Sequence, residues 1–182
     1  MKLELLGGLT ARQFLRDHWQ KKPLLVRQAI PGFRGVLSRT ELFALTRDQD
    51  VQSRLISNKR GKWQLAKGPF GKNQLRQLTP SNWTILIQDL NHFVGAGTDL
   101  LRKFSFIPYA RLDDLMVSYA APGGGVGPHF DSYDVFLLQG EGTRRWRISA
   151  QKDLSLVPNL PLKILQNFRA EQEWVLSPGD ML

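Results

Sequence analysis

Two short helices are predicted near the N-terminus, each from a sequence that caps a helix start. Residues Thr10 to Gln13 and Ser38 to Glu41 both place a hydroxyl three residues before a Gln or Glu, which is the pattern of a capping box. Apolar residues follow each box, so both helices are expected to pack as scaffold. Between them, Pro23–Arg27 predicts a short strand.

The middle of the chain predicts a hairpin and then further helices. Residues 53–67 favour a hairpin that turns near Lys59, Arg60 and Gly61. The sequence Thr79-Pro80-Ser81 predicts a helix start that continues to about Phe93, and residues 98–104 predict a further short helix. His18 and His92 fall on these predicted helices beside aromatic residues, where an imidazole is ordinarily structural rather than a metal ligand.

From Asp113 onward the pattern changes to short strands. Strands are expected over Asp113–Ala120, His129–Gln139, Arg144–Ser149, Lys163–Gln166 and Trp174–Leu176. An ordered series of this kind is typical of a double-stranded β-helix, the jelly-roll form of the cupins. The predicted fold class is therefore mainly β with N-terminal helices (α+β), in one domain over residues 1–182. Roughly 1–112 form its helical and hairpin part and 113–182 its jelly-roll strands, which are incomplete at the C-terminus.

Composition indicates a globular chain and excludes several classes of protein. Hydrophobic residues make up 42% and charged residues 23% of 182 residues, a balance that argues against disorder. No apolar stretch is long enough to span a bilayer, so no membrane association is expected, and the first residues lack the apolar core of a signal peptide. The absence of Cys excludes disulfides and thiolate metal sites and is compatible with a cytoplasmic location.

The formal net charge of +9 raises the question of a polyanionic partner. Scattered solubilising Lys and Arg residues would explain it equally well, because the basic residues cluster only mildly and no RRM or KH signature is present. Proximity to ribosomal RNA stays open on this basis.

His129-Phe130-Asp131 is the strongest chemical signal in the sequence. On a strand, residues i and i+2 point to the same face, so this imidazole and carboxylate could grip one metal ion together. Non-heme Fe(II) oxygenases use two His and one carboxylate, and the remaining positions bind co-substrate and dioxygen. The glycines before His129 allow close approach of the backbone to a site. Asp134 would point the other way and pair with a basic neighbour.

Arg144 is the candidate anchor for a dicarboxylic co-substrate. A guanidinium can hold a remote carboxylate with two parallel charge-assisted hydrogen bonds. Strand alternation predicts that Arg145 points to the opposite face from Arg144.

Three further residues could line a pocket. Asp114 would supply a carboxylate, and Met116 and Tyr133 would supply a thioether and an aromatic wall. A structural interpretation fits the pattern as well: Met116 as core filler, Tyr133 as a wall aromatic and Asp114 as a strand-edge solubiliser.

These residues lie in a sequence that resembles the YcfD-type bacterial ribosomal oxygenases, which are JmjC and cupin-like 2-oxoglutarate oxygenases. The resemblance rests on the following segments: Pro122 to Phe136 with its His-x-Asp pair, Gly142 to Arg147, Phe14 to Pro23, Ser53 to Ile56, Gly61 to Gln64, Gly68 to Phe70, and Asp113 to Met116. It therefore spans nearly the whole chain.

The resemblance implies an enzyme with Fe(II), 2-oxoglutarate and dioxygen as cofactor and co-substrates. It implies that His129 and Asp131 hold iron with a distal His and that Arg144 anchors 2-oxoglutarate. It further implies that Asp114, Met116 and Tyr133 contact the substrate, an arginine side chain of a large-subunit ribosomal protein. Full-length members of the family are expected to be homodimers.

The sequence departs from the family at its C-terminus. The family pattern of Pro-Gly-Asp, a short strand and the distal His begins at Ser177-Pro178-Gly179-Asp180 and stops roughly ten residues too early. We therefore expect a truncated chain that is inactive by itself. The alternatives are a metal-dependent cupin acting on a small molecule, in which Arg144 would hold substrate, and a non-catalytic binding protein.

Overall fold

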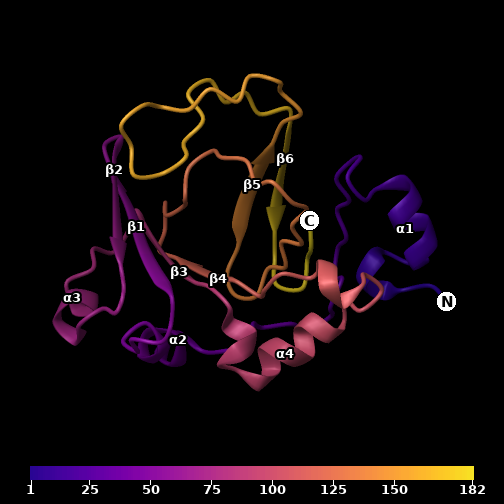
Figure 1. The fold of residues 1–182 in the computed structure, drawn as a ribbon, viewed down its shortest axis with the longest axis horizontal. Helices are drawn as coiled ribbons and strands as arrows, with labels where there is room; N and C mark the ends of the chain where they lie inside the picture. The colour runs from indigo at the N-terminus through magenta and orange to yellow at the C-terminus, as the bar shows by residue number, and fades with distance from the viewer. The chain divides into compact units, whose positions relative to one another are not determined.

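The chain divides into two compact units, each built from segments that are separated in the sequence. The computed structural model describes all residues from Met1 to Leu182 (Figure 1). The first unit comprises Met1–Gly35, Phe130–Leu154 and Asn167–Leu182, and the second comprises Val36–His129 and Ser155–Gln166. None of the helices combines the length and apolar character that crossing a membrane requires.

A four-stranded antiparallel sheet forms the centre of the second unit. Its strands are β1 (Ser53–Lys59), β2 (Lys62–Lys67), β3 (Trp83–Ile87) and β4 (Val117–Ala120), in the order β2-β1-β3-β4. The tip of the β1–β2 hairpin has Arg60 and Gly61 at positive φ, the conformation that a tight hairpin turn requires. The hairpin predicted over residues 53–67 is confirmed.

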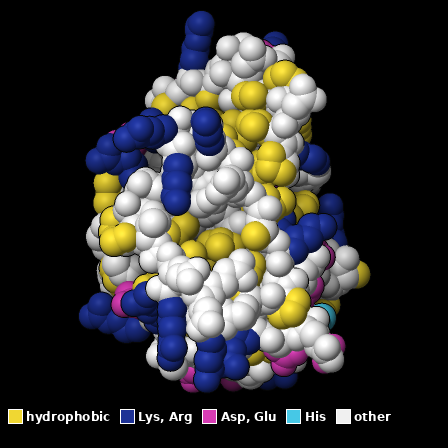
Figure 2. Space-filling model, turned by 90° about the vertical axis from the view of Figure 1, so that its left-hand side faces the viewer, with side chains coloured by type: hydrophobic (Ala, Val, Ile, Leu, Met, Phe, Trp, Pro, Cys, Tyr) yellow, Lys and Arg dark blue, Asp and Glu magenta, His cyan; other side chains and the backbone are white.

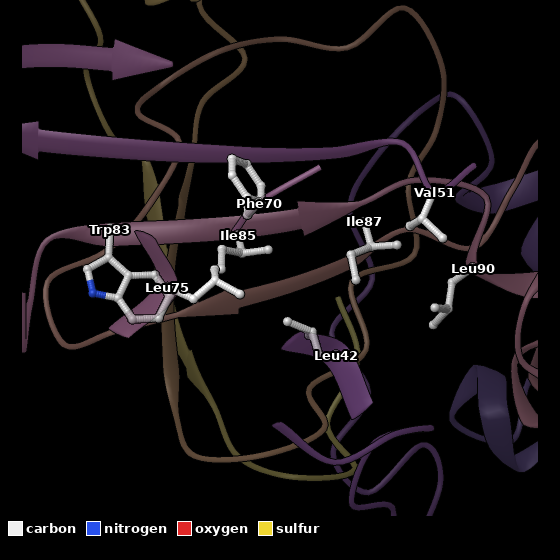
Figure 3. Packing of buried hydrophobic residues seen from close by; sticks show 8 residues of the cluster. All are labelled: Leu42, Val51, Phe70, Leu75, Trp83, Ile85, Ile87 and Leu90. Carbon is white, nitrogen blue, oxygen red and sulfur yellow. The ribbon is translucent and has the colours of Figure 1, made fainter. Parts of the chain in front are cut away.

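The core of the second unit lies on one face of this sheet. Strand β3 is buried at all five positions, and its Trp83, Ile85 and Ile87 pack with Leu42 of α2 (Arg39–Leu45) and Leu75 of α3 (Lys72–Arg76) (Figure 3). Alternation along β3 explains this set, because residues two apart share a face. Burying each of these large side chains contributes about 1.5–3 kcal/mol to folding.

Both predicted capping boxes are present. Thr10 Oγ1 accepts a hydrogen bond from the Gln13 amide at 3.1 Å at the start of α1 (Ala11–Asp17), and Ser38 Oγ accepts one from the Glu41 amide at 3.3 Å at the start of α2. The remaining elements are η2 (Leu90–His92), α4 (Gly95–Arg102) and η3 (Tyr109–Arg111) in the second unit, and η1 (Glu4–Leu6), β5 (Arg144–Ile148) and β6 (Gln172–Leu176) in the first. The last two pair antiparallel.

The helix predicted from Thr79 to Phe93 is wrong. Strand β3 and the short helix η2 occupy this segment instead. The sequence Trp83 to Ile87 consists of β-branched and aromatic residues apart from one Leu, and these favour a pleated and buried strand. Pairing with a strand on each side decides the outcome, whereas the Thr-Pro-Ser sequence indicated only a local start. The helix predicted over 98–104 is confirmed as α4, which begins earlier, at Gly95.

Several predicted strands are reduced to isolated bridges. The segments 129–139, 163–166 and 23–27 contribute only the bridges Leu138–Met181, Leu156–Leu165 and Val26–Met181. The strand expected from Asp113 begins only at Val117, because residues 114 and 115 bond instead to the segment around η2: Asp114 accepts the Asp89 amide and Leu115 accepts the Leu90 amide. Strands over Arg144–Ser149 and Trp174–Leu176 are confirmed within one residue or two as β5 and β6.

A buried carboxylate organises the last turn of the first unit. Asp180 is 3% exposed and accepts hydrogen bonds from Arg27 Nη1 at 2.6 Å, the Gln28 amide at 3.0 Å and the Ser177 amide at 3.0 Å. Burial by itself would raise the pKa of Asp180, but the bonds from Ser177, Gln28 and Arg27 outweigh it, so the pKa lies below its usual value. The carboxylate thus joins the turn at 177–180 to the segment around Val26.

Replacing this carboxylate should destabilise the protein in a pH-dependent way. Because the pKa of Asp180 is lower in the folded protein, its contribution is fully present above the unfolded-state value of about 4 and is lost as the pH falls through the folded-state value. We expect Asp180→Asn to lower the free energy of unfolding by about 1–3 kcal/mol at pH 7, measured by urea unfolding. The difference from the parent protein should narrow as the pH is lowered below 4.

Asp99→Asn is the matched control, because Asp99 also pairs with an arginine, Arg102, but is 71% exposed. An exposed pair contributes little, so this variant should unfold close to the parent protein. Equal losses in the two variants, or a loss for Asp180→Asn that does not change with pH, would contradict the structural role of Asp180.

Candidate metal and substrate site

The first candidate ligand, His129, has one ring nitrogen engaged by the backbone. Its Nδ1 lies 2.9 Å from the carbonyl oxygen of Gly127. When Nδ1 carries the proton, it donates to this carbonyl, and Nε2 is then the ring nitrogen with the lone pair. Metal-binding histidines commonly use such a bond to fix the tautomer and the ring orientation. The side chain is exposed, as access for a metal requires.

The backbone before His129 is held by close packing that only glycine permits. Gly127 has φ +77°, and a Cβ there would lie 2.5 Å from Ile164 Cδ1 and 3.0 Å from the Trp63 ring. The next residue, Pro128, accepts a hydrogen bond from the Leu165 amide at 2.8 Å. The glycine expected to allow close backbone approach therefore does so here, and it fixes the chain that leads into the candidate ligand pair.

The second candidate ligand, Asp131, lies in irregular backbone of the first unit. The strand that would place His129 and Asp131 on one face is not formed. Strand alternation therefore no longer supports their joint binding of a metal ion. Only their separation by two residues in the sequence still relates the two side chains. Asp131 is exposed, and Tyr133 is 63% exposed. Asp134 accepts a hydrogen bond from the Gln20 amide at 3.3 Å, although we expected a basic side chain as its partner.

Arg144 and Arg145 face opposite sides of the β5–β6 sheet. Arg144 is half-buried on β5, with its guanidinium carbon 5.9 Å from the centre of the Trp146 ring. Burial lowers its pKa from the ordinary value, so an anionic ligand would offset the cost of burying this cation. Arg145 is exposed and forms an ion pair with Glu173 at 3.5 Å. Of the two, Arg144 is the one withdrawn from water.

In the second unit, Asp114 is oriented by an amide relay. Its Oδ2 accepts hydrogen bonds from Gln88 Nε2 at 2.8 Å and from the Asp89 amide at 2.9 Å. Arg54 in turn donates to Gln88 Oε1 at 3.1 Å and lies 3.9 Å from the sulfur of Met116. Both of these hydrogen bonds end on Oδ2 of Asp114, so Oδ1 takes no part in the relay.

Sequence reasoning found Asp114 and Met116 but missed Arg54 and Gln88. The sheet brings them together: Arg54 pairs with Leu86, and Leu86 pairs with Ser118, two residues after Met116. Gln88 follows β3 directly. No local pattern links residues 54, 88 and 114, since only the strand order of the sheet makes them neighbours.

The other two histidines lie at helical elements. His18 ends α1, where its ring stacks on Phe14 with centroids 6.1 Å apart, and His92 lies in η2. His18 also lines a cavity of about 210 Å³ in the first unit, together with Phe14 and Trp19, and none of the six candidate site residues lines it. No group of three or more His, Cys, Asp or Glu side chains is positioned to hold a metal ion.

Comparison with known proteins shows what the chain is similar to. Residues 99–182 match the model of the JmjC domain. It is 41% identical over 170 residues to the ribosomal protein uL16 3-hydroxylase of Escherichia coli, an alignment that covers 93% of this chain and 45% of that protein. It is 38% identical over 178 residues to a Haemophilus influenzae protein named probable ribosomal oxygenase, covering 96% of this chain and 44% of that protein.

Solved structures of YcfD are also similar to this chain. The X-ray structure of E. coli YcfD matches with a TM-score of 0.87 and 40% identity, covering 95% of this chain and 46% of that one. YcfD in complex with cobalt and 2-oxoglutarate matches with a TM-score of 0.84, covering 95% of this chain and 45% of that one. These matches confirm the predicted cupin and JmjC fold class. The chain spans about half the length of the curated relatives it matches.

Adding a methyl group at Gly127 should disturb the backbone before His129. We expect Gly127→Ala to cost about 1–3 kcal/mol, because the left-handed conformation and the contact with Ile164 both oppose a Cβ. For a chain of this size that loss lowers Tm by about 2–4 °C per kcal/mol, measurable by circular dichroism.

Gly125→Ala is the control in the same loop, since a Cβ there meets nothing within 4 Å. It should leave Tm unchanged or slightly raised. If both variants behave alike, the packing around Gly127 does not hold this segment.

Proposed function

We propose that this chain belongs to a 2-oxoglutarate- and Fe(II)-dependent oxygenase that hydroxylates an arginine side chain of a large-subunit ribosomal protein. The main support is the 41% identity, over 93% of the chain, to a protein named ribosomal protein uL16 3-hydroxylase. The chemistry of the six candidate residues fits the same activity. A ribosomal substrate would place the enzyme in the cytoplasm. The homodimer expected from the resemblance and the ribosomal RNA proximity that the net charge leaves open belong to the same proposal.

His129 and Asp131 are the proposed metal ligands in this chain. The bond between Nδ1 of His129 and Gly127 suits a ligating Nε2, and a carboxylate and an imidazole are the donors that iron takes in such enzymes. Bound iron would couple decarboxylation of 2-oxoglutarate to activation of dioxygen. The resemblance implies a distal His as the third ligand, and His18 and His92 lie at α1 and in η2, so the proposal includes that the 182 residues alone are inactive.

Arg144 is the proposed anchor for the far carboxylate of 2-oxoglutarate. Its half-buried position strengthens any ion pair it forms, because water competes less there than at the surface. The guanidinium carbon lies 5.9 Å from the centre of the Trp146 ring, which limits the orientations that the guanidinium can take. Arg145 cannot substitute, since it faces the opposite side and pairs with Glu173.

Asp114, Met116 and Tyr133 are the proposed substrate contacts. Asp114 would accept the substrate guanidinium on Oδ1, while Gln88 and the Asp89 amide hold Oδ2. Met116 is 43% exposed and Tyr133 63% exposed, so both can cover the aliphatic stem of an arginine. Gln88 is thus proposed as a positioning residue that orients Asp114.

The co-substrate assignment predicts different effects for the two adjacent arginines. In a chain extended to the length of its relatives, Arg144→Ala should weaken 2-oxoglutarate binding by about 2–3 kcal/mol, at least tenfold, because a charge-assisted bidentate contact is lost. Arg145→Ala should leave the apparent KM for 2-oxoglutarate unchanged. Succinate formation at varied 2-oxoglutarate concentration measures the apparent KM of both variants. If Arg145→Ala raised this KM and Arg144→Ala did not, Arg145 and not Arg144 would be the anchor.

The substrate assignment is tested by mass spectrometry of an arginine-containing uL16 peptide. Asp114→Ala should abolish the gain of one oxygen while uncoupled 2-oxoglutarate turnover continues, because an unpaired guanidinium in the pocket costs several kcal/mol, on the order of a hundredfold in rate or more. Gln88→Leu should raise the peptide KM without changing that for 2-oxoglutarate. Asp113→Ala, at the exposed neighbour, is the control. Hydroxylation at the parental rate in Asp114→Ala would overturn the assignment.

A further inference from the structure

The segment from Val51 to Gln88 contains seven basic residues and no acidic one. The whole chain has 25 Lys and Arg against 16 Asp and Glu, so all 16 acidic residues lie outside this segment, together with 18 basic ones. Arg54 is directed to Gln88 and is half-buried. The other six are exposed: Lys59, Arg60, Lys62, Lys67, Lys72 and Arg76. We call these six the β2-edge surface.

The arrangement of these cations is unfavourable for the fold itself. Lys59 lies directly opposite Lys62 across the hairpin, and Arg54 lies opposite Lys67. Like charges at such positions destabilise a sheet. On α3, Lys72 and Arg76 are four residues apart, the spacing at which like charges destabilise a helix. Three such pairs in one segment that has no acidic residue are a cost to the fold, which a bound polyanion would offset.

The six cations follow one border of the second unit. Strand β2 is the edge of the sheet, the hairpin tip has three of the cations, and α3 follows β2 in the chain after a short connection. Figure 2 views this side, and Lys and Arg side chains are spread over the face while the few Asp and Glu side chains lie mostly toward its lower part. Edge strands often have Lys to prevent pairing with another sheet, but that need does not extend to the turn or to α3.

We propose that the β2-edge surface binds the phosphate backbone of double-helical RNA. The aromatic residues of the hairpin and α3 region offer no exposed ring: Trp63 is half-buried with its ring at Gly127, and Phe70 is 2% exposed. Base stacking on single strands therefore has no exposed ring here, whereas helical RNA is bound largely through phosphates and shape. This surface is separate from the proposed oxygenase chemistry, and its test requires no turnover.

Fluorescence anisotropy with a labelled RNA duplex of about 16 base pairs tests the proposal. The triple variant Lys59→Gln, Arg60→Gln, Lys62→Gln should bind at least about tenfold more weakly, and the slope of log affinity against log salt should fall by about 2 to 3. The control triple Lys2→Gln, Arg12→Gln, Lys152→Gln removes the same charge from exposed positions of the first unit. It should lose much less affinity.

A second variant separates binding from folding. Lys62→Glu replaces the repulsion with Lys59 by an attraction, so Tm should rise by about 1–3 °C while duplex binding falls. Equal losses in the two triple variants would overturn the proposal, because net charge alone would then explain binding. Parental affinity in Lys62→Glu and in the hairpin triple would overturn it too, as would competition by polyglutamate as effective as by unlabelled RNA.

Discussion

Strand β3 is the element on which the rest of the second unit depends. Its five residues are all buried, and it pairs antiparallel with β1 on one side and β4 on the other. One face packs against the helices α2 and α3 through Leu42 and Leu75. The register in which β3 pairs with β1 and β4 brings Arg54, Gln88 and Met116 together. A single buried strand therefore determines both the core and the surroundings of Asp114.

The site residues are held by small numbers of specific contacts rather than by regular secondary structure. Asp114 precedes β4 and is oriented by Gln88 and the Asp89 amide, and His129 follows a loop packed at Gly127. Irregular backbone of this kind needs side-chain and backbone partners for its polar groups, because no strand ladder supplies them. Those partners also fix the functional atoms, so orientation and local folding come from the same bonds.

Charge is distributed according to two different needs. Asp180 is a buried carboxylate surrounded by donors, and its ionisation stabilises the turn that contains it. Arg144 is a half-buried cation, and its burial favours an anionic ligand. The β2-edge surface is the opposite case, with exposed cations that repel one another across the hairpin. The first arrangement serves the fold, whereas the repulsion across the hairpin opposes it.

The amino-acid sequence by itself determined the features that depend on neighbouring residues. Both capping boxes, the β1–β2 hairpin, the alternation that separates Arg144 from Arg145, and the cupin and JmjC fold class were all predictable, because each is encoded within a few residues or in motifs of fixed spacing. Tertiary structure decided the rest. Residues 83–87 became a strand instead of a helix because two strands pair with them. In the segment 129–139, backbone pairing is limited to residues 137–139, which bond to residues 179–182. The relay from Arg54 through Gln88 to Asp114 joins residues far apart in the chain, and only the strand order of the sheet makes them neighbours.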